Sequence, residues 1–116
     1  MADTHRQSRW TLPEFLAWEE QQDTRNEFVD GRVRAMVGGT RRHNAIALNV
    51  ASFLSRRLRG SKCAPYGADM KTVTPAGNVR YADVTVDCGP MKGDDIAATE
   101  PTVVVEVVSK STSYVD

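Results

Sequence analysis

Apolar residues recur at helical spacing in two segments of the chain. In the first, Thr11 and Glu14 form a capping-box pattern, and the apolar stripe that follows ends near Gln21. The second segment, residues 43–59, has an apolar side chain every three or four positions: Ile46, Val50, Phe53, Leu54 and Leu58. The pattern therefore predicts two helices, and Gly60 is placed to end the second.

A tight hairpin is predicted over residues 26–37. Asp30-Gly31 stands between two strand-like runs, and both positions of such a turn favour positive φ, which Asp and Gly tolerate. After the turn the side chains alternate between two faces, Val33, Ala35 and Val37 on one and Arg32, Arg34 and Met36 on the other.

Three further runs have the composition of strands. Residues 70–74 and 79–87 are short runs separated by a Pro- and Gly-containing turn. Residues 102–108 are apolar at almost every position, which predicts a central strand buried on both faces. Together with the helices, these strands indicate one mixed α and β domain.

Length and composition restrict the class of protein. The 116 residues suit one domain, residues 10–116, after a polar tail, residues 1–9, that we expect to be disordered. Lys and Arg number 15 and so do Asp and Glu, which removes overall basicity as an argument for nucleic-acid binding but not a local basic patch. Without a membrane span or a signal peptide, we expect a cytoplasmic protein, with Cys63 and Cys88 as reduced structural thiols.

Two carboxylates interrupt the strand-like runs. Asp83 begins the run Asp83-Val84-Thr85-Val86, and Glu106 lies within the apolar residues 102–108. A buried carboxylate requires a cation, a metal or hydrogen-bond donors. If the two strands are neighbours, the carboxylates converge and can hold Mg²⁺, which needs one or two carboxylates plus water and a phosphate. The alternative is that each acid forms a salt bridge with one of the arginines.

Several motifs together resemble the Uma-two family of bacterial restriction-endonuclease-like proteins. The strongest are Tyr81-Ala82-Asp83-Val84, the run from Glu100 to Ser109 that contains Glu106, and Ser111-Thr112. The opening helix, the hairpin over residues 26–31 and His43 fit as well. The resemblance covers roughly residues 10 to 116, and the combination is more specific than any single motif.

The resemblance implies a fold and a set of site residues. The fold is α+β and restriction-endonuclease-like, of the PD-(D/E)XK superfamily, with a central mixed sheet, an N-terminal hairpin and flanking helices. Asp83 and Glu106 would be the two acids of the signature and would bind Mg²⁺ or Mn²⁺. Glu27 would join the metal shell, His43 would lie near the site, and the backbone carbonyl of Val107 would be a further ligand. Taken without the resemblance, His43 reads equally as a surface or capping residue.

The sequence departs from the family at the lysine. The usual signature has Lys two residues after the second acid, and this chain has Val108 there. Lys110 stands where the family usually has Pro, and as a loop residue it reads as a solvated side chain. In related nucleases the lysine lies on a following helix, and the chain ends at Asp116, so we expect a domain that is incomplete at its C-terminus.

The leading hypothesis is a metal-dependent endonuclease that hydrolyses DNA phosphodiester bonds. Arg41 and Arg42, before the helix that His43 opens, form a candidate phosphate site, although solvated loop arginines would look the same. The alternatives are a non-catalytic interaction module with the same fold and a structural domain in which both acids are salt-bridged. A homodimer is an expectation from the fold type alone.

Overall fold

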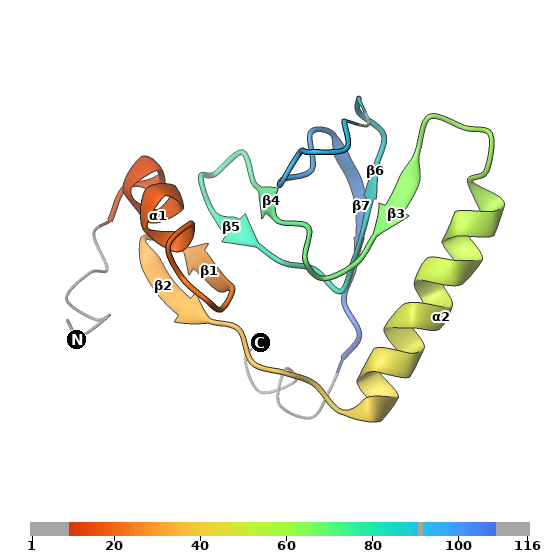
Figure 1. Ribbon diagram of the computed structural model, residues 1–116, viewed down its shortest axis with the longest axis horizontal. Coiled ribbons are helices and arrows are strands. Elements are labelled where there is room, and N and C mark those ends of the chain that lie inside the picture. Colours follow the sequence, from red (N-terminus) through yellow and green to blue (C-terminus); the bar gives the residue numbers. More distant parts are fainter. Residues whose placement is uncertain (1–9, 91, 109–116) are drawn as a thin grey trace.

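The computed structural model describes residues 10–90 and 92–108, which form an α+β fold of two antiparallel sheets and two helices (Figure 1). The elements are α1 (Leu12–Glu19), β1 (Asn26–Val29), β2 (Arg32–Ala35), α2 (Arg41–Arg57), β3 (Ala64–Tyr66), β4 (Thr72–Val73), β5 (Val79–Arg80), β6 (Val84–Asp87) and β7 (Pro101–Val105). One sheet has the order β2-β1-β5-β4 and the other β3-β6-β7. The described residues thus differ from the single mixed sheet that the resemblance implied.

The first helix and the first sheet share the larger apolar core. Thr11 and Glu14 form the predicted capping box at the start of α1, with reciprocal side-chain to backbone hydrogen bonds of 3.3 and 2.8 Å. Phe15 points from α1 to the sheet, where its ring stacks on Phe28 at a centroid distance of 4.9 Å. Val79 and Tyr81 complete this buried cluster, so α1 is anchored by aromatic packing rather than by its own short length.

The predicted hairpin is confirmed, with the expected turn. Asp30 has φ of 53° and Gly31 has φ of 80°, the conformation that a two-residue turn of this kind requires. A two-residue turn fixes the register, so Val29 lies opposite Arg32 and Glu27 lies opposite Arg34. Directly opposite residues have side chains on the same face, and this pairing matters for the site below.

A buried polar network ties α1 to the sheet. The Glu19 carboxylate accepts hydrogen bonds from Lys71 Nζ at 2.5 Å, Tyr81 Oη at 2.7 Å and the Asn26 amide at 3.1 Å. Burial alone would raise the pKa of Glu19, but these bonds together outweigh it and lower the pKa. The same burial and the nearby Glu19 charge raise the pKa of Tyr81. The network is fully satisfied, which is the condition for burying such groups.

One continuous segment connects the two sheets. Residues 79–87, predicted as a single strand, are divided: β5 belongs to the first sheet and β6 to the second, with residues 81–83 between them. The segment crosses the middle of the molecule in Figure 1. Its side chains are mostly buried, and this explains why the apolar pattern continues across the division.

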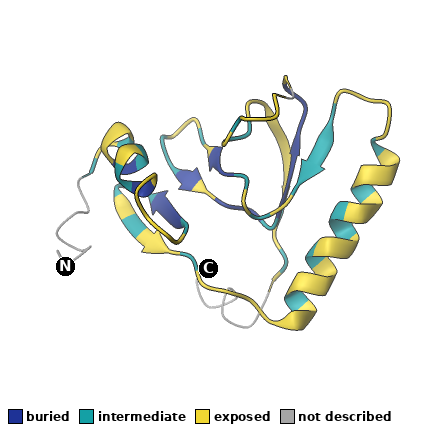
Figure 2. Ribbon diagram, in the orientation of Figure 1, coloured by how far each residue is buried: buried dark blue, intermediate teal, exposed yellow. Residues whose placement is uncertain are grey.

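Strand β7 is exposed, so the prediction of a central strand buried on both faces is wrong. Within the part of the chain that the structure describes, it pairs with β6 alone and is the last strand of its sheet. Val103 and Val104, which alternate between the faces, are 49% and 53% exposed. The buried strand is its neighbour β6, all of whose residues are buried (Figure 2). An apolar run identifies a strand, but its burial depends on neighbours that the run does not specify.

The second helix lies along the second sheet and contacts β3 and β6 (Figure 1). It begins at Arg41, two residues before the predicted start, because the Thr40 side chain caps it by accepting from the His43 amide. None of its residues is buried, and Ile46, Leu48 and Phe53 are among the exposed large apolar side chains (Figure 2). The helix therefore covers the sheet with one side only.

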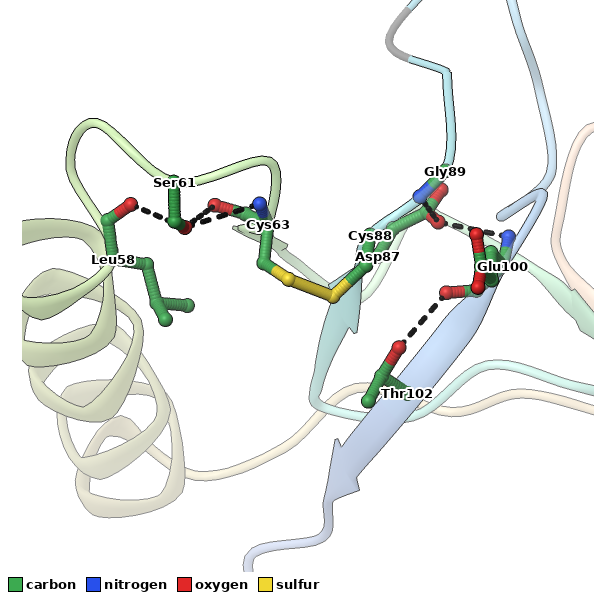
Figure 3. The surroundings of a disulfide bond; sticks show 8 residues. All are labelled: Leu58, Ser61, Cys63, Asp87, Cys88, Gly89, Glu100 and Thr102. Atoms are coloured by element: carbon green, nitrogen blue, oxygen red, sulfur yellow. Dashed lines mark hydrogen bonds between the residues drawn. A yellow bond between two sulfur atoms is a disulfide. The ribbon is translucent and has the colours of Figure 1, made fainter.

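Cys63 and Cys88 form a disulfide, so the prediction of reduced thiols is wrong (Figure 3). Strand β3 pairs with β6 so that Ala64 lies opposite Asp87, and the cysteines are the next pair in that register. Their Cα atoms are 4.0 Å apart. Strand β3 contains Pro65, which is unusual in a strand, and it was not predicted from the sequence. The proximity of the two cysteines could therefore not be predicted either.

Two of the predictions concern residues that the structure does not describe. The tail, residues 1–9, and Lys110 lie outside the described residues. Among residues 10–90 and 92–108, no helix is long and apolar enough to cross a membrane.

Candidate functional site

Asp83 and Glu106 lie side by side where β6 begins and β7 ends. The last pair of the β6–β7 ladder is Val84 opposite Val105, and Asp83 and Glu106 are the residues directly beyond it. The chain stays close after β7 ends, because the Val107 amide donates to Asp83 Oδ2 at 2.7 Å. The predicted convergence of the two acids is therefore a consequence of strand register.

The His43 ring reaches the same carboxylate from the start of α2. Its Nε2 lies 3.2 Å from Asp83 Oδ2, and both side chains are 17% exposed. Gly39 lies against the ring, where a Cβ atom would be only 3.1 Å from Nδ1. That Nδ1 is buried and has no hydrogen-bond partner among the described residues. His43 is thus fixed beside the acid pair, rather than being a free surface residue.

Glu27 is near the acid pair but is held by other groups. Its Oε1 accepts from Arg34 Nη2 at 3.1 Å, and its Oε2 accepts from the Tyr81 amide at 3.0 Å and from Arg80 Nε at 3.4 Å. The residue is only 6% exposed. Glu27 therefore adds negative charge to the site, while its oxygens are engaged by an amide and two guanidinium groups.

The carboxylates of the candidate site repel one another. Partial burial of its carboxyl group raises the pKa of Glu106, and the negative charges of Asp83 and Glu27 raise it further. The positive charge of Arg80 acts in the opposite direction. A carboxylate whose pKa is raised by like charges favours a cation nearby, so the electrostatics of the pair suit a positively charged ligand.

The donor set suits a hard divalent cation with few protein ligands. Within the described ranges, no group of three or more His, Cys, Asp and Glu side chains is arranged to hold a metal ion. A closed zinc-like site is therefore not formed there. Mg²⁺ and Mn²⁺ need fewer protein groups, because water and phosphate oxygens complete their shells. Asp83 and Glu106 fit that requirement, and the contact that the structure gives for Val107 is through its amide.

The basic residues near the acids are not those that the sequence predicted. Arg41 and Arg42 are exposed in the first turn of α2. Val108, at the usual position of the lysine, is 74% exposed. Arg34 and Arg80, the two arginines that contact Glu27, were not predicted as site residues. Arg34 could have been found, because the Asp-Gly turn places it opposite Glu27; Arg80 could not, because its contact joins distant segments.

Comparison with known proteins adds a family and a fold. Residues 12–116 match the Uma2 family, described as "Putative restriction endonuclease". An uncharacterized protein of Synechocystis sp. is 34% identical over 105 residues, and a second is 27% identical over 110 residues. The matches include 89% and 91% of this chain but only 55% and 62% of the relatives, so the chain spans little more than half of their length.

A solved structure shares the fold. It is described as a "putative nuclease belonging to DUF820" from Anabaena variabilis, and it superposes with a TM-score of 0.58 at 17% identity. The match covers 66% of this chain and 42% of that one. At this level of identity the likeness concerns the fold alone.

Proposed function

The chain belongs to the Uma2 family, and we propose that it carries the metal-binding acids of an endonuclease that hydrolyses DNA phosphodiester bonds. The observation that carries the proposal is the convergence of Asp83 and Glu106 directly beyond Val84 and Val105, the last pair of the β6–β7 ladder. The restriction-endonuclease-like reading of the fold and the assignment of DNA as substrate belong to this proposal.

In the proposed site, Asp83 and Glu106 bind Mg²⁺ or Mn²⁺. The bound cation would stabilise the negative charge that develops on the phosphodiester and would acidify a water molecule. Val107 has two roles in this proposal. Its amide donates to Asp83 and orients that carboxylate, and its carbonyl is a further ligand of the cation. Glu27 contributes negative charge from a distance, because both its oxygens are already hydrogen-bonded.

His43 acts on Asp83 as a positioning residue. Its Nε2 contact and its packing against Gly39 fix one oxygen of the carboxylate. Groups that orient a metal ligand commonly change metal affinity by 10- to 100-fold when they are removed. His43→Ala should therefore lower the affinity for the metal, although both carboxylate ligands remain.

The alternative function is a non-catalytic interaction module that keeps the nuclease-like fold. The presence of Val108 at the usual lysine position favours it, because a valine cannot orient a nucleophile or stabilise a charge. In this alternative Asp83 and Glu106 still bind a cation, but no bond is broken.

The experiment combines metal binding with plasmid nicking. Mg²⁺ and Mn²⁺ are titrated calorimetrically into the wild type, Asp83→Ala, Glu106→Ala and the matched control Asp94→Ala, which changes an exposed loop acid. We expect both site variants to lose metal binding and nicking of supercoiled plasmid, and the control to retain them. Metal binding without nicking by the wild type would favour the interaction module. Absence of metal binding by the wild type would reject both functions.

A further inference from the structure

Two arginines are held together by one buried carboxylate at the edge of the candidate site. Arg34 comes from β2 and Arg80 from β5, on either side of β1, which carries Glu27. The Glu27 side chain is 7% exposed, whereas the Arg34 and Arg80 side chains are 50% and 44% exposed. The carboxylate is therefore internal, and the guanidinium groups face outward from it.

Most of the hydrogen-bonding capacity of the two guanidinium groups is unused by the described residues. Each group carries five N–H donors in a planar fork. Towards residues 10–90 and 92–108, Arg34 uses only Nη2 and Arg80 uses only Nε, in both cases to Glu27. The remaining donors belong to half-exposed side chains whose positions the buried Glu27 restricts. Such an arrangement is suited to a planar or tetrahedral oxyanion.

The net charge of this group is also favourable. Two guanidinium groups and one carboxylate leave one positive charge, next to an acid pair that is negative. Arg80 is the last residue of β5 and precedes Asp83 by three residues, and it contacts Glu27. Its positive charge acts to lower the pKa of Glu106, which agrees with this position near the proposed metal ligands. The tyrosine that follows Arg80 donates its amide to Glu27, so the backbone at this point is fixed as well.

We propose that Arg34 and Arg80, bridged by Glu27, form a phosphate clamp that binds the oxyanion of a phosphodiester beside Asp83 and Glu106. This inference rests on the proposed function and deepens it, because it names the groups that hold the substrate phosphate. The clamp supplies positive charge that Val108 cannot supply at the usual lysine position. It also differs from Arg41 and Arg42, whose exposed side chains at the start of α2 were the phosphate site expected from sequence.

The test measures binding separately from cleavage. A fluorescein-labelled 12-base-pair DNA duplex is titrated with the wild type, Arg34→Gln, Arg80→Gln and the matched control Arg59→Gln, by anisotropy in EDTA and again with Ca²⁺. We expect each clamp variant to bind about tenfold more weakly, as for loss of one charged bidentate contact, and the slope of log K against log salt to fall by about one. The control residue, Arg59, is exposed in the turn that follows α2, and its variant should bind like the wild type.

Two further measurements protect the test from a folding artefact and identify the ligand. Arg80→Lys keeps the charge but not the fork, so it should bind with intermediate affinity while its thermal melt matches that of Arg80→Gln. Inorganic phosphate is used as a competitor. Displacement of the duplex by phosphate at equal phosphate concentration would identify free phosphate as the ligand, and displacement only at a large excess would identify a nucleic acid.

Three outcomes would overturn the clamp. They are unchanged duplex affinity in both clamp variants, an equal loss in the Arg59→Gln control, and no binding by the wild type in either buffer. A loss in Arg41→Gln and Arg42→Gln alone would return the phosphate site to the start of α2. Arginine-dependent binding without any plasmid nicking would leave the clamp intact and reject only the nuclease activity.

Discussion

Strand β6 is preceded by Asp83 and ends at Asp87, and these two carboxylates have opposite surroundings. Asp87 accepts three backbone N–H groups, from Gly89 at 3.0 Å, Thr99 at 3.0 Å and Glu100 at 2.8 Å. Burial alone would raise the pKa of Asp87, but these bonds together outweigh it and lower the pKa. The disulfide of the adjacent Cys88 closes the same end (Figure 3).

Asp83, at the other end of β6, faces a second carboxylate. It receives one backbone N–H, from Val107, and lies beside His43, while Glu106 occupies the position opposite. Burial raises the pKa of Glu106, and the negative charges of Asp83 and Glu27 raise it further, so the charges here are only partly compensated. One residue type thus has two uses: Asp87 holds the chain in place, whereas Asp83 faces a second carboxylate and binds a cation in the proposed function.

The largest expected effect on the free energy of unfolding is at Asp87, where the carboxylate accepts three backbone N–H groups. Asp87→Ala leaves three backbone N–H groups without their acceptor, so the free energy of unfolding should fall by about 3–5 kcal/mol. Asp83→Ala should cost about 1 kcal/mol, because it removes one such acceptor. Urea denaturation followed by circular dichroism measures both. Equal losses in the two variants would show that the ends of β6 do not differ as described.

Reduction of the disulfide should have the next largest effect. Cys63 and Cys88 are 25 residues apart, and closing a loop of that length stabilises a fold by about 3 kcal/mol through the unfolded state. Adding dithiothreitol should therefore lower the urea midpoint. The Cys63→Ser/Cys88→Ser double variant serves as the control, because its midpoint should not respond to the reductant. An unchanged wild-type midpoint would contradict the bond.

The two ends should respond to acid with opposite signs. Asp87 has a lowered pKa, so its contribution to stability is present above its ordinary value of 3.8 and is lost as pH falls through the lowered value. Glu106 has a raised pKa, so the folded state gains stability as pH falls from the raised value towards 4.5. Urea midpoints from pH 3 to 8 should show the gain disappear in Glu106→Gln and the loss diminish in Asp87→Asn. Variants that keep the wild-type profile would disprove these assignments.

A substitution between the two ends should have the smallest effect on folding. Val104 lies opposite Thr85 in the middle of the β6–β7 ladder and is 53% exposed. Val104→Lys should change the unfolding free energy by less than about 0.5 kcal/mol. Among residues 10–90 and 92–108, β7 is the last strand of its sheet, so the lysine should also lower any self-association through β7, as measured by sedimentation velocity. A large change in metal affinity would show that the acid pair depends on this edge.

The elements that could be predicted from the sequence are those set by residues close together in the chain. The capping box at Thr11, the Asp30-Gly31 turn and the periodicity of residues 43–59 each act within a few residues, and each element is present. The turn even fixes the contact between Glu27 and Arg34. These features need no knowledge of what lies across the sheet.

The remaining features depend on contacts between distant segments. An apolar pattern runs through residues 79–87 whether the segment belongs to one sheet or, as here, to two. The pairing of β3 with β6 brings Cys63 to Cys88, and no local sequence pattern predicts that pairing. For the site, the carboxylates in two strand-like runs and the family resemblance both pointed to Asp83 and Glu106. The contact of Arg80 with Glu27 could be seen only in the folded structure.

The short connection between β5 and β6 has a consequence for how this gene can vary. The amide of Tyr81 donates to Glu27 of the first sheet, and two residues later Asp83 lies beside Glu106 where the second sheet begins. One inserted or deleted residue would displace one of these contacts, since both are set by position along the chain. Natural variants that retain the site should therefore keep the length of residues 80–83 unchanged, and length changes should be found instead in exposed loops such as residues 92–94.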